Sequence, residues 1–159
     1  MFDFLKKNKD IVAPVSGKVI DLSEVPDEVF AQRLAGDGVA ILPTGNKIVA
    51  PADGVLTLLF NTGHAFAITL KNGVELLVHI GIDTVALNGK GFTKLVEQGI
   101  KVKAGMPIVR IDKEAVEAAG YSLITPVLIT NPEIIKDLKG AVWETAVAGE
   151  TQIIDYKMA

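Results

Sequence analysis

The chain has 159 residues, 49% of them apolar and 22% charged, which suits one domain with a full core and excludes a disordered chain. Its net charge of −3, with no basic run beyond residues 6–9, argues against a nucleic-acid partner, and the absence of cysteine excludes disulfides and thiolate metal sites. No apolar stretch approaches the roughly 18 residues of a membrane span, and the first residues lack a signal-peptide pattern, so we expect a cytoplasmic protein.

Glycine and proline residues separate short apolar runs along the whole chain, a rhythm that is typical of all-β proteins. The predicted strands cover residues 18–22, 39–43, 47–50, 54–59, 65–70, 75–80, 108–111, 122–129 and 152–156. Helical patterns are few and short, at residues 26–34, 92–98, 113–119 and 132–138. The expected fold class is therefore all-β: an antiparallel β-sandwich or barrel-sandwich hybrid with a few short helices.

Two sequence segments occur twice. Residues 13–19 (APVSGKV) return as residues 50–56 (APADGVL), and residues 102–108 (VKAGMPI) weakly match residues 147–153 (VAGETQI). Two copies of each segment predict pseudo-symmetric halves of one sandwich, because a solenoid needs three or more units. We expect an N-terminal tail over residues 1–12 and a single domain over residues 13–159.

The only two histidines, His64 and His79, lie in two predicted strands that flank Lys71-Asn72-Gly73. Asn-Gly tolerates the positive φ angles of a tight hairpin turn, so the two strands should pair. A simple hairpin register then sets His64 and His79 roughly opposite each other.

This pair defines a candidate site with the Thr62 hydroxyl and the Asp83 carboxylate beside it. Apolar candidates for its rim are Phe60, Phe66, Leu77, Ile80 and Ile82. A single histidine in an apolar strand is more often a hydrogen-bonded core residue than a catalyst. Two histidines that face each other favour proton or phosphoryl chemistry instead, since an imidazole whose other nitrogen is held is a competent nucleophile.

Residues 73–85 (GVELLVHIGIDTV) resemble the signature of the glucose-type IIA proteins of the bacterial sugar phosphotransferase system. The similarity extends over residues 13–131 and includes GDG at 36–38, PTG at 43–45 and TGHA at 62–65. The resemblance implies that His79 is phosphorylated on Nε2, that His64 supports the transfer, and that Thr62 orients the ring of His64. In this interpretation Gly81 offers its carbonyl to Nδ1 of His79.

The resemblance also implies an exposed apolar depression that docks partner proteins. Phe30 and Phe60 match rim phenylalanines, Leu77 replaces a phenylalanine found in some members, and Asp27 and Asp83 match acids that face a basic partner. The implied partners are the histidine phosphocarrier protein as donor and the IIB domain of a sugar permease as acceptor. Regulatory protein targets are a further partner class, and neither a metal nor an organic cofactor is needed.

Two other functions stay open on the residues alone. His64, His79 and Asp83 could ligate zinc in a β-sandwich hydrolase, although no His-x-His pair or third histidine is present. The repeated glycine turns also suit a biotinyl- or lipoyl-type carrier. Its modified lysine would be Lys71, which lacks the expected flanking residues.

Overall fold

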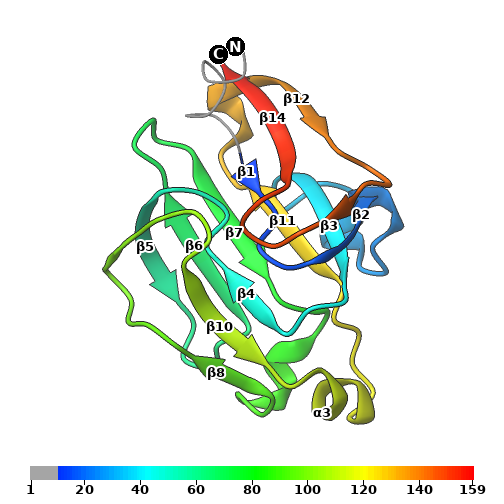
Figure 1. Cartoon of the computed structure of the whole chain (residues 1–159). Helices are drawn as coiled ribbons and strands as arrows, with labels where there is room; N and C mark the ends of the chain where they lie inside the picture. Colours follow the sequence, from blue (N-terminus) through cyan, green and yellow to red (C-terminus); the bar gives the residue numbers. More distant parts are fainter. Residues whose placement is uncertain (1–10) are drawn as a thin grey trace.

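The computed structural model describes residues 11–159, whose regular secondary structure is mainly β-strand (Figure 1). The strands are β1 (Ile11–Val12), β2 (Gly17–Asp21), β3 (Asp37–Pro43), β4 (Lys47–Val49), β5 (Gly54–Leu59), β6 (Ala65–Thr69), β7 (Glu75–His79), β8 (Phe92–Lys94), β9 (Lys101–Val102), β10 (Pro107–Ile111), β11 (Thr125–Ile129), β12 (Ile135–Gly140), β13 (Thr145–Ala146) and β14 (Gln152–Met158). The helices in this range are α2 (Glu28–Ala31), α3 (Lys113–Ala118) and the 3-10 turns η2 (Leu22–Glu24), η3 (Thr84–Leu87) and η4 (Pro132–Ile134). None of the described helices is long and apolar enough to cross a bilayer.

The strands form antiparallel sheets. The largest has the order β13-β2-β3-β11-β7-β6-β5-β9, and two three-stranded sheets have the orders β1-β14-β12 and β4-β10-β8. In the largest sheet β11 lies between β3 and β7, and all five of its residues are buried. The predicted antiparallel all-β architecture is confirmed.

The predicted hairpin at residues 71–73 is present. β6 pairs with β7 in an unbroken antiparallel register that sets Ala65 opposite His79. In the turn Gly73 has a φ of +93°, and the side chain of Asn72 accepts a hydrogen bond from the backbone N–H of Val74 at 3.0 Å. The Asn-Gly pair therefore does what its chemistry predicts, since asparagine caps the turn and glycine takes the left-handed conformation.

Reciprocal hydrogen bonds relate the two copies of the first repeat. The N–H of Val12 donates to the carbonyl of Pro51 (2.8 Å), and the N–H of Val49 donates to the carbonyl of Pro14 (2.7 Å). The shift that maps residues 13–19 onto residues 50–56 also maps Val12 onto Val49 and Pro14 onto Pro51, so the two hydrogen bonds are equivalent. The internal repeat in the sequence is thus a structural pseudo-symmetry.

The second repeat contacts the first through backbone hydrogen bonds. The N–H of Gly105 donates to the carbonyl of Ala50, and the N–H of Gly149 donates to the carbonyl of Ala13, both at 2.8 Å. A Cβ added to Gly149 would lie 3.0 Å from the Cα of Gly105, so the two backbones touch. Glycine at both positions allows this approach.

A second apolar cluster lies outside the main core, under the segment that connects β2 to β3. We call residues 22–36 the β2–β3 loop, and we call this group the outer cluster. It contains Ile20, Leu22, Val25, Phe30, Ala40, Ile82 and Leu128. The loop contributes Leu22, Val25 and Phe30, and the remaining residues belong to β2, β3, β11 and the segment after β7. Burial of these three side chains fixes the first half of the loop against the sheet.

The structure corrects two predicted helices. Residues 92–98 contain β8, which pairs with β10, and residues 132–138 contain η4 and then β12, which pairs with β14. In both segments the apolar residues recur at three- and four-residue spacing, which imitates a helix face, and pairing with a neighbouring strand overrides the pattern. α2 and α3 lie within the predicted ranges 26–34 and 113–119.

The N-terminal boundary also differs from the expected one. Ile11 is fully buried and pairs with Ile154 of β14. Residues 11 and 12, assigned to the tail from sequence, therefore belong to a sheet because Ile11 fills part of the main core. Residues 1–10 of the predicted tail lie outside the described residues.

Candidate functional site

Two histidines and two phenylalanines form one group of rings at the end of the β6–β7 hairpin. The ring centroids of His64 and His79 lie 5.2 Å apart. Phe30 packs against His79 at 5.1 Å, and Phe60 packs edge-on against His64 at 5.0 Å. The predicted meeting of the two histidines is present, and an aromatic ring covers each of them on one side.

The register explains how the two rings meet. Ala65 lies opposite His79, so His64 lies opposite Ile80, whose N–H donates to the carbonyl of His64 at 2.6 Å. Strict alternation along a strand would send His64 and His79 to opposite faces of the sheet. His64 precedes β6 and follows Gly63, which has a φ of +74°. Because His64 lies outside the strand, its ring can reach the same face as the ring of His79.

A backbone carbonyl fixes the tautomer of His79. Nδ1 of His79 lies 2.7 Å from the carbonyl oxygen of Gly81, and because a carbonyl only accepts, Nδ1 carries the proton. Nε2 of the neutral ring is then left with a free lone pair. This is the contact that the resemblance implied for Gly81.

The segment after His79 holds that carbonyl in place. Gly81 has a φ of +88°, and a Cβ there would lie 2.5 Å from Cγ2 of Thr84 and 2.7 Å from the carbonyl oxygen of Ser122. The Thr84 hydroxyl donates to the carbonyl of Ile80 at 2.6 Å. The position therefore requires glycine for both its space and its backbone angle.

The Thr62 hydroxyl is hydrogen-bonded to Nδ1 of His64. His64 is only 3% exposed, so this bond satisfies a nitrogen that water does not reach freely. When the hydroxyl donates, Nε2 of His64 carries the proton and can act as a donor toward the neighbouring ring. The structure thus places Thr62 where the sequence expected it.

Burial lowers the pKa of both histidines below its usual value of 6.5. For His79, loss of solvation is the main cause, and the hydrogen bond to Gly81 and the charges of Asp27 and Asp83 partly oppose it. For His64, loss of solvation acts first and the neighbouring His79 adds to it. Both rings are therefore neutral at pH 7, which leaves a lone pair free for nucleophilic attack.

The two acids lie on different segments beside His79. Asp27 caps α2, its carboxylate accepting the N–H of Val29 at 2.9 Å. Asp83 is exposed, and its backbone is left-handed with a φ of +59°. Both are close enough to raise the pKa of His79, so they add negative potential to the edge of the site.

The expected apolar rim is only partly present. Phe60 is 38% exposed, Leu77 is half-buried against the outer cluster, and Phe30 is buried there. Ile80 and Phe66 are fully buried in the main core, so the expectation that they line the surface was wrong. Their strand positions point inward, on the opposite face from Leu77 and His79.

Three exposed apolar residues near the site escaped the sequence analysis. Val29 is 50% exposed and Leu34 is 70% exposed, both on the β2–β3 loop, and Val85 is exposed on η3. α2 and η3 span only four residues each, too few to show a periodic apolar face. No sequence signal could have singled them out.

Residues 11–159 hold no group of three or more histidine, cysteine, aspartate or glutamate side chains placed to bind a metal ion. The zinc interpretation required His64, His79 and Asp83 to form such a group. Lys71, the lysine of the lipoyl interpretation, is exposed in the turn of the hairpin.

Comparison with known proteins gives one consistent result. The family model described as phosphoenolpyruvate-dependent sugar phosphotransferase system, EIIA 1, matches residues 9–135. The chain is 49% identical over 139 residues to a "PTS system glucose-specific EIIA component" of Borreliella burgdorferi, covering 86% of this chain and 74% of that one. It is 45% identical over 152 residues to a "PTS system N-acetylglucosamine-specific EIICBA component" of Klebsiella pneumoniae, covering 96% of this chain and 23% of that one. The solved glucose permease IIA of Mycoplasma capricolum superposes with a TM-score of 0.85 at 41% identity, covering 91% and 94% of the two chains.

Proposed function

The chain belongs to the EIIA 1 family of the phosphoenolpyruvate-dependent sugar phosphotransferase system, and on that premise we propose that it carries the phosphoryl group on Nε2 of His79. Proteins of this family relay a phosphoryl group from the histidine phosphocarrier protein to a IIB component. The proposal concerns which residues of this chain perform the relay and what each of them contributes.

The hydrogen bond from Nδ1 of His79 to the carbonyl of Gly81 is the observation that carries the assignment. It leaves the Nε2 lone pair free to attack the phosphorus of the donor phosphohistidine. The new N–P bond forms as the donor's N–P bond breaks, and the donor nitrogen keeps the electron pair. The same exchange runs from His79 to a nucleophile on the IIB domain in the second half of the relay.

His64 is the electrostatic partner in this mechanism. With the Thr62 hydroxyl donating to its Nδ1, His64 directs an Nε2–H toward a phosphoryl oxygen on His79. A preorganised donor of this kind stabilises charge that develops on the transferring group. The lowered pKa values keep both rings neutral until the phosphoryl dianion arrives, and that dianion favours a cationic His64. The mechanism uses no metal or organic cofactor.

Partner proteins dock on the surface around His79. Phe60 and Leu77 supply its apolar part, and Asp27 and Asp83 supply negative charge that attracts a basic partner. The first repeat, the hairpin and β11 all contribute to one core with Ile11, which supports a single phosphotransfer domain that begins at β1 and includes the predicted residues 13–159. Both partners act on the cytoplasmic side of a permease, so we place this chain in the cytoplasm.

The sugar is proposed to be glucose, because the Borreliella burgdorferi and Mycoplasma capricolum relatives are named for it. The Klebsiella pneumoniae relative is named for N-acetylglucosamine, so the IIB partners of both sugars belong in the test. Regulatory targets would share the same docking surface.

The experiment is a mass measurement after incubation with phosphoenolpyruvate and the two general phosphotransferase proteins. We expect a gain of one phosphate that maps to the peptide containing His79 and then moves to an added IIB domain. Bound zinc would favour the hydrolase interpretation, and a lipoyl or biotinyl adduct on Lys71 would favour the carrier interpretation. A phosphate that maps to His64 would contradict the assignment.

A further inference from the structure

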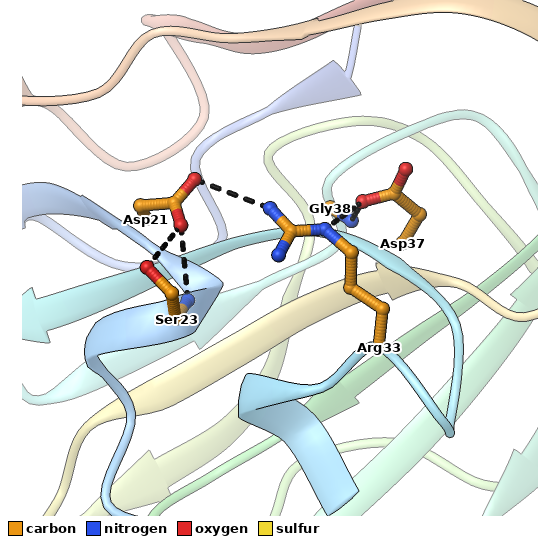
Figure 2. A network of polar contacts seen from close by, with 5 residues as sticks. All are labelled: Asp21, Ser23, Arg33, Asp37 and Gly38. Carbon is orange, nitrogen blue, oxygen red and sulfur yellow. Dashed lines mark hydrogen bonds and ion pairs between the residues drawn. The ribbon is translucent and has the colours of Figure 1, made fainter. Parts of the chain in front are cut away.

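One arginine joins the two ends of the β2–β3 loop. Nη2 of Arg33 lies 3.2 Å from Oδ1 of Asp21, and Nε lies 2.9 Å from Oδ1 of Asp37. Figure 2 shows the guanidinium between the two carboxylates. Asp21 is the last residue of β2 and Asp37 is the first residue of β3. β2 and β3 pair at the base of the loop, and the ion pairs tie the loop at Arg33 to that base.

Both carboxylates also accept hydrogen bonds from groups other than Arg33. Oδ2 of Asp21 accepts the N–H of Ser23 at 3.0 Å and its hydroxyl at 2.5 Å. Oδ1 of Asp37 accepts the N–H of Gly38 at 2.9 Å. The hydrogen bonds from Ser23, with the charge of Arg33 adding to them, lower the pKa of Asp21. Asp21 is therefore a fixed, ionised anchor at neutral pH.

The backbone of Arg33 takes a conformation that usually belongs to glycine. Its φ is +59°, and it follows α2 in a Schellman-type ending. The N–H of Leu34 donates to the carbonyl of Val29 at 2.9 Å, and the N–H of Arg33 donates to the carbonyl of Phe30 at 3.0 Å. Glycine is preferred at this position because a side chain there is strained. An arginine at this position indicates that its side chain has a use.

The second half of the loop has little else to hold it. Its first half is fixed by Leu22, Val25 and Phe30 in the outer cluster, whereas among residues 31–35 only Ala35 packs, partly buried, against that cluster. Arg33 lies in the middle of that stretch. Besides the small side chain of Ala35, the two ion pairs are thus the side-chain contacts that join the return of the loop to the sheet.

This loop forms one wall of the histidine site. It carries Phe30, whose ring packs against His79 at 5.1 Å, and Asp27, whose charge acts on the same ring. A small displacement of the loop would therefore move both groups relative to the phosphoryl acceptor. Because Asp27 is one of the two acids that attract a basic partner, such a displacement would weaken binding of the donor protein.

We propose that Arg33 is a positioning residue for phosphoryl transfer: by bridging Asp21 and Asp37 it closes the β2–β3 loop and holds Phe30 and Asp27 in register with His79. For its consequence in catalysis this inference rests on the proposed function. Exposed ion pairs contribute little to the free energy of unfolding, so the effect falls on the position of the loop and not on global stability.

Arg33→Gly is the informative variant, because it removes both ion pairs while suiting the left-handed backbone. Asp137→Gly is its matched control. Asp137 also has a positive φ, +52°, and an exposed ion pair, 3.9 Å to Lys157, but it lies in β12 of another sheet. Arg33→Lys keeps the charge on a side chain that cannot form the same fork, so it should recover part of any loss.

Two measurements read the outcome. The first is the NMR position of the His79 ring signals, which the ring current of Phe30 shifts and for which Phe30→Ala supplies the reference. The second is steady-state transfer from the phosphorylated phosphocarrier protein. In Arg33→Gly we expect the His79 signals to move toward their Phe30→Ala positions. We also expect the KM of Arg33→Gly for the donor to rise about fivefold to tenfold, with kcat little changed. The KM of Arg33→Lys should lie between those of the parent and Arg33→Gly.

Unchanged His79 signals and an unchanged KM in Arg33→Gly would overturn the inference, and so would equal changes in Asp137→Gly. The NMR comparison needs no phosphoryl donor. If the parent protein fails to accept phosphate, the proposed function is contradicted, whereas the effect of Arg33 on the site is still measured separately.

Discussion

The rings of His64 and His79 meet almost at right angles, with an interplanar angle of 79° and centroids 5.2 Å apart. The hydrogen bond of each Nδ1 fixes the direction in which its Nε2 points. One ring can then hold a phosphoryl group while the other donates to it from the side. The two histidines should therefore respond differently to the same substitution.

His79→Gln is expected to abolish phosphate acceptance, because glutamine has no nucleophilic nitrogen to replace Nε2. The measurement is transfer of labelled phosphate from phosphoenolpyruvate through the two general proteins. Labelling of this variant at the parental rate would refute the role of His79.

His64→Gln is expected to accept phosphate but to pass it on poorly. The amide can donate a hydrogen bond to the phosphoryl group but cannot become cationic as charge develops. Onward transfer should fall by about 10²–10³-fold, the range for removal of one charge-stabilising donor. Single-turnover transfer to a IIB domain tests this, and a parental rate would show that the cation is not needed.

Asp27→Asn combined with Asp83→Asn should slow association with the phosphocarrier protein and flatten its dependence on ionic strength. Charges at the edge of a docking surface act mainly on the association rate. Phe60→Ala should instead hasten dissociation, because Phe60 is 38% exposed beside His64 and an apolar anchor acts on residence time. Stopped-flow kinetics at two salt concentrations separate the two effects. Parental association of the double variant at low salt would exclude steering by these acids.

Gly81→Ala should destabilise the protein by about 1–3 kcal/mol and slow phosphate acceptance, because the new Cβ collides with Thr84 and the Ser122 carbonyl and displaces the acceptor of His79 Nδ1. Urea unfolding and acceptance rates measure both effects. Gly120→Ala is the control: its φ is +92°, but a Cβ there meets nothing within 4 Å. Equal losses in both variants would assign the cost to backbone angle alone.

Both histidines should titrate below pH 6.5 in the folded protein, because burial lowers both pKa values. The unfolded chain then binds protons more readily, so the histidine contribution to stability is complete above about pH 6.5 and is lost as the pH falls toward the folded pKa values. NMR titration of the ring protons gives the midpoints, and His79→Gln should raise that of His64. Midpoints at or above 6.5 would contradict the burial argument.

Local signals predicted the parts of the fold that local chemistry controls. The Asn72-Gly73 turn and α3 both formed where the sequence placed them. Residues 92–98 and 132–138 did not, since their strands depend on partners far along the chain. In β12 a left-handed Asp137 and a register shift also break the alternation that would have revealed a strand.

Some features of the candidate site could also be predicted from local sequence, and others could not. His64, His79 and their hydrogen bonds to Thr62 and Gly81 span two residues each, so a motif could carry them. The burial of Ile80 follows from strand alternation and could have been predicted. The bridge of Arg33 to Asp21 could not have been predicted, because it depends on a left-handed backbone at Arg33, a position where the sequence has no glycine to indicate that conformation.

The place of β11 in the largest sheet also bears on how the protein forms during synthesis. The hairpin of His64 and His79 is synthesised before residues 125–129, yet β11 is the strand that joins β7 to β3. Until then β3 and β7 each present an open edge, and the outer cluster lacks Leu128. A nascent chain therefore holds both histidines without the complete sheet that supports the site, and the order of translation delays the function until β11 has emerged.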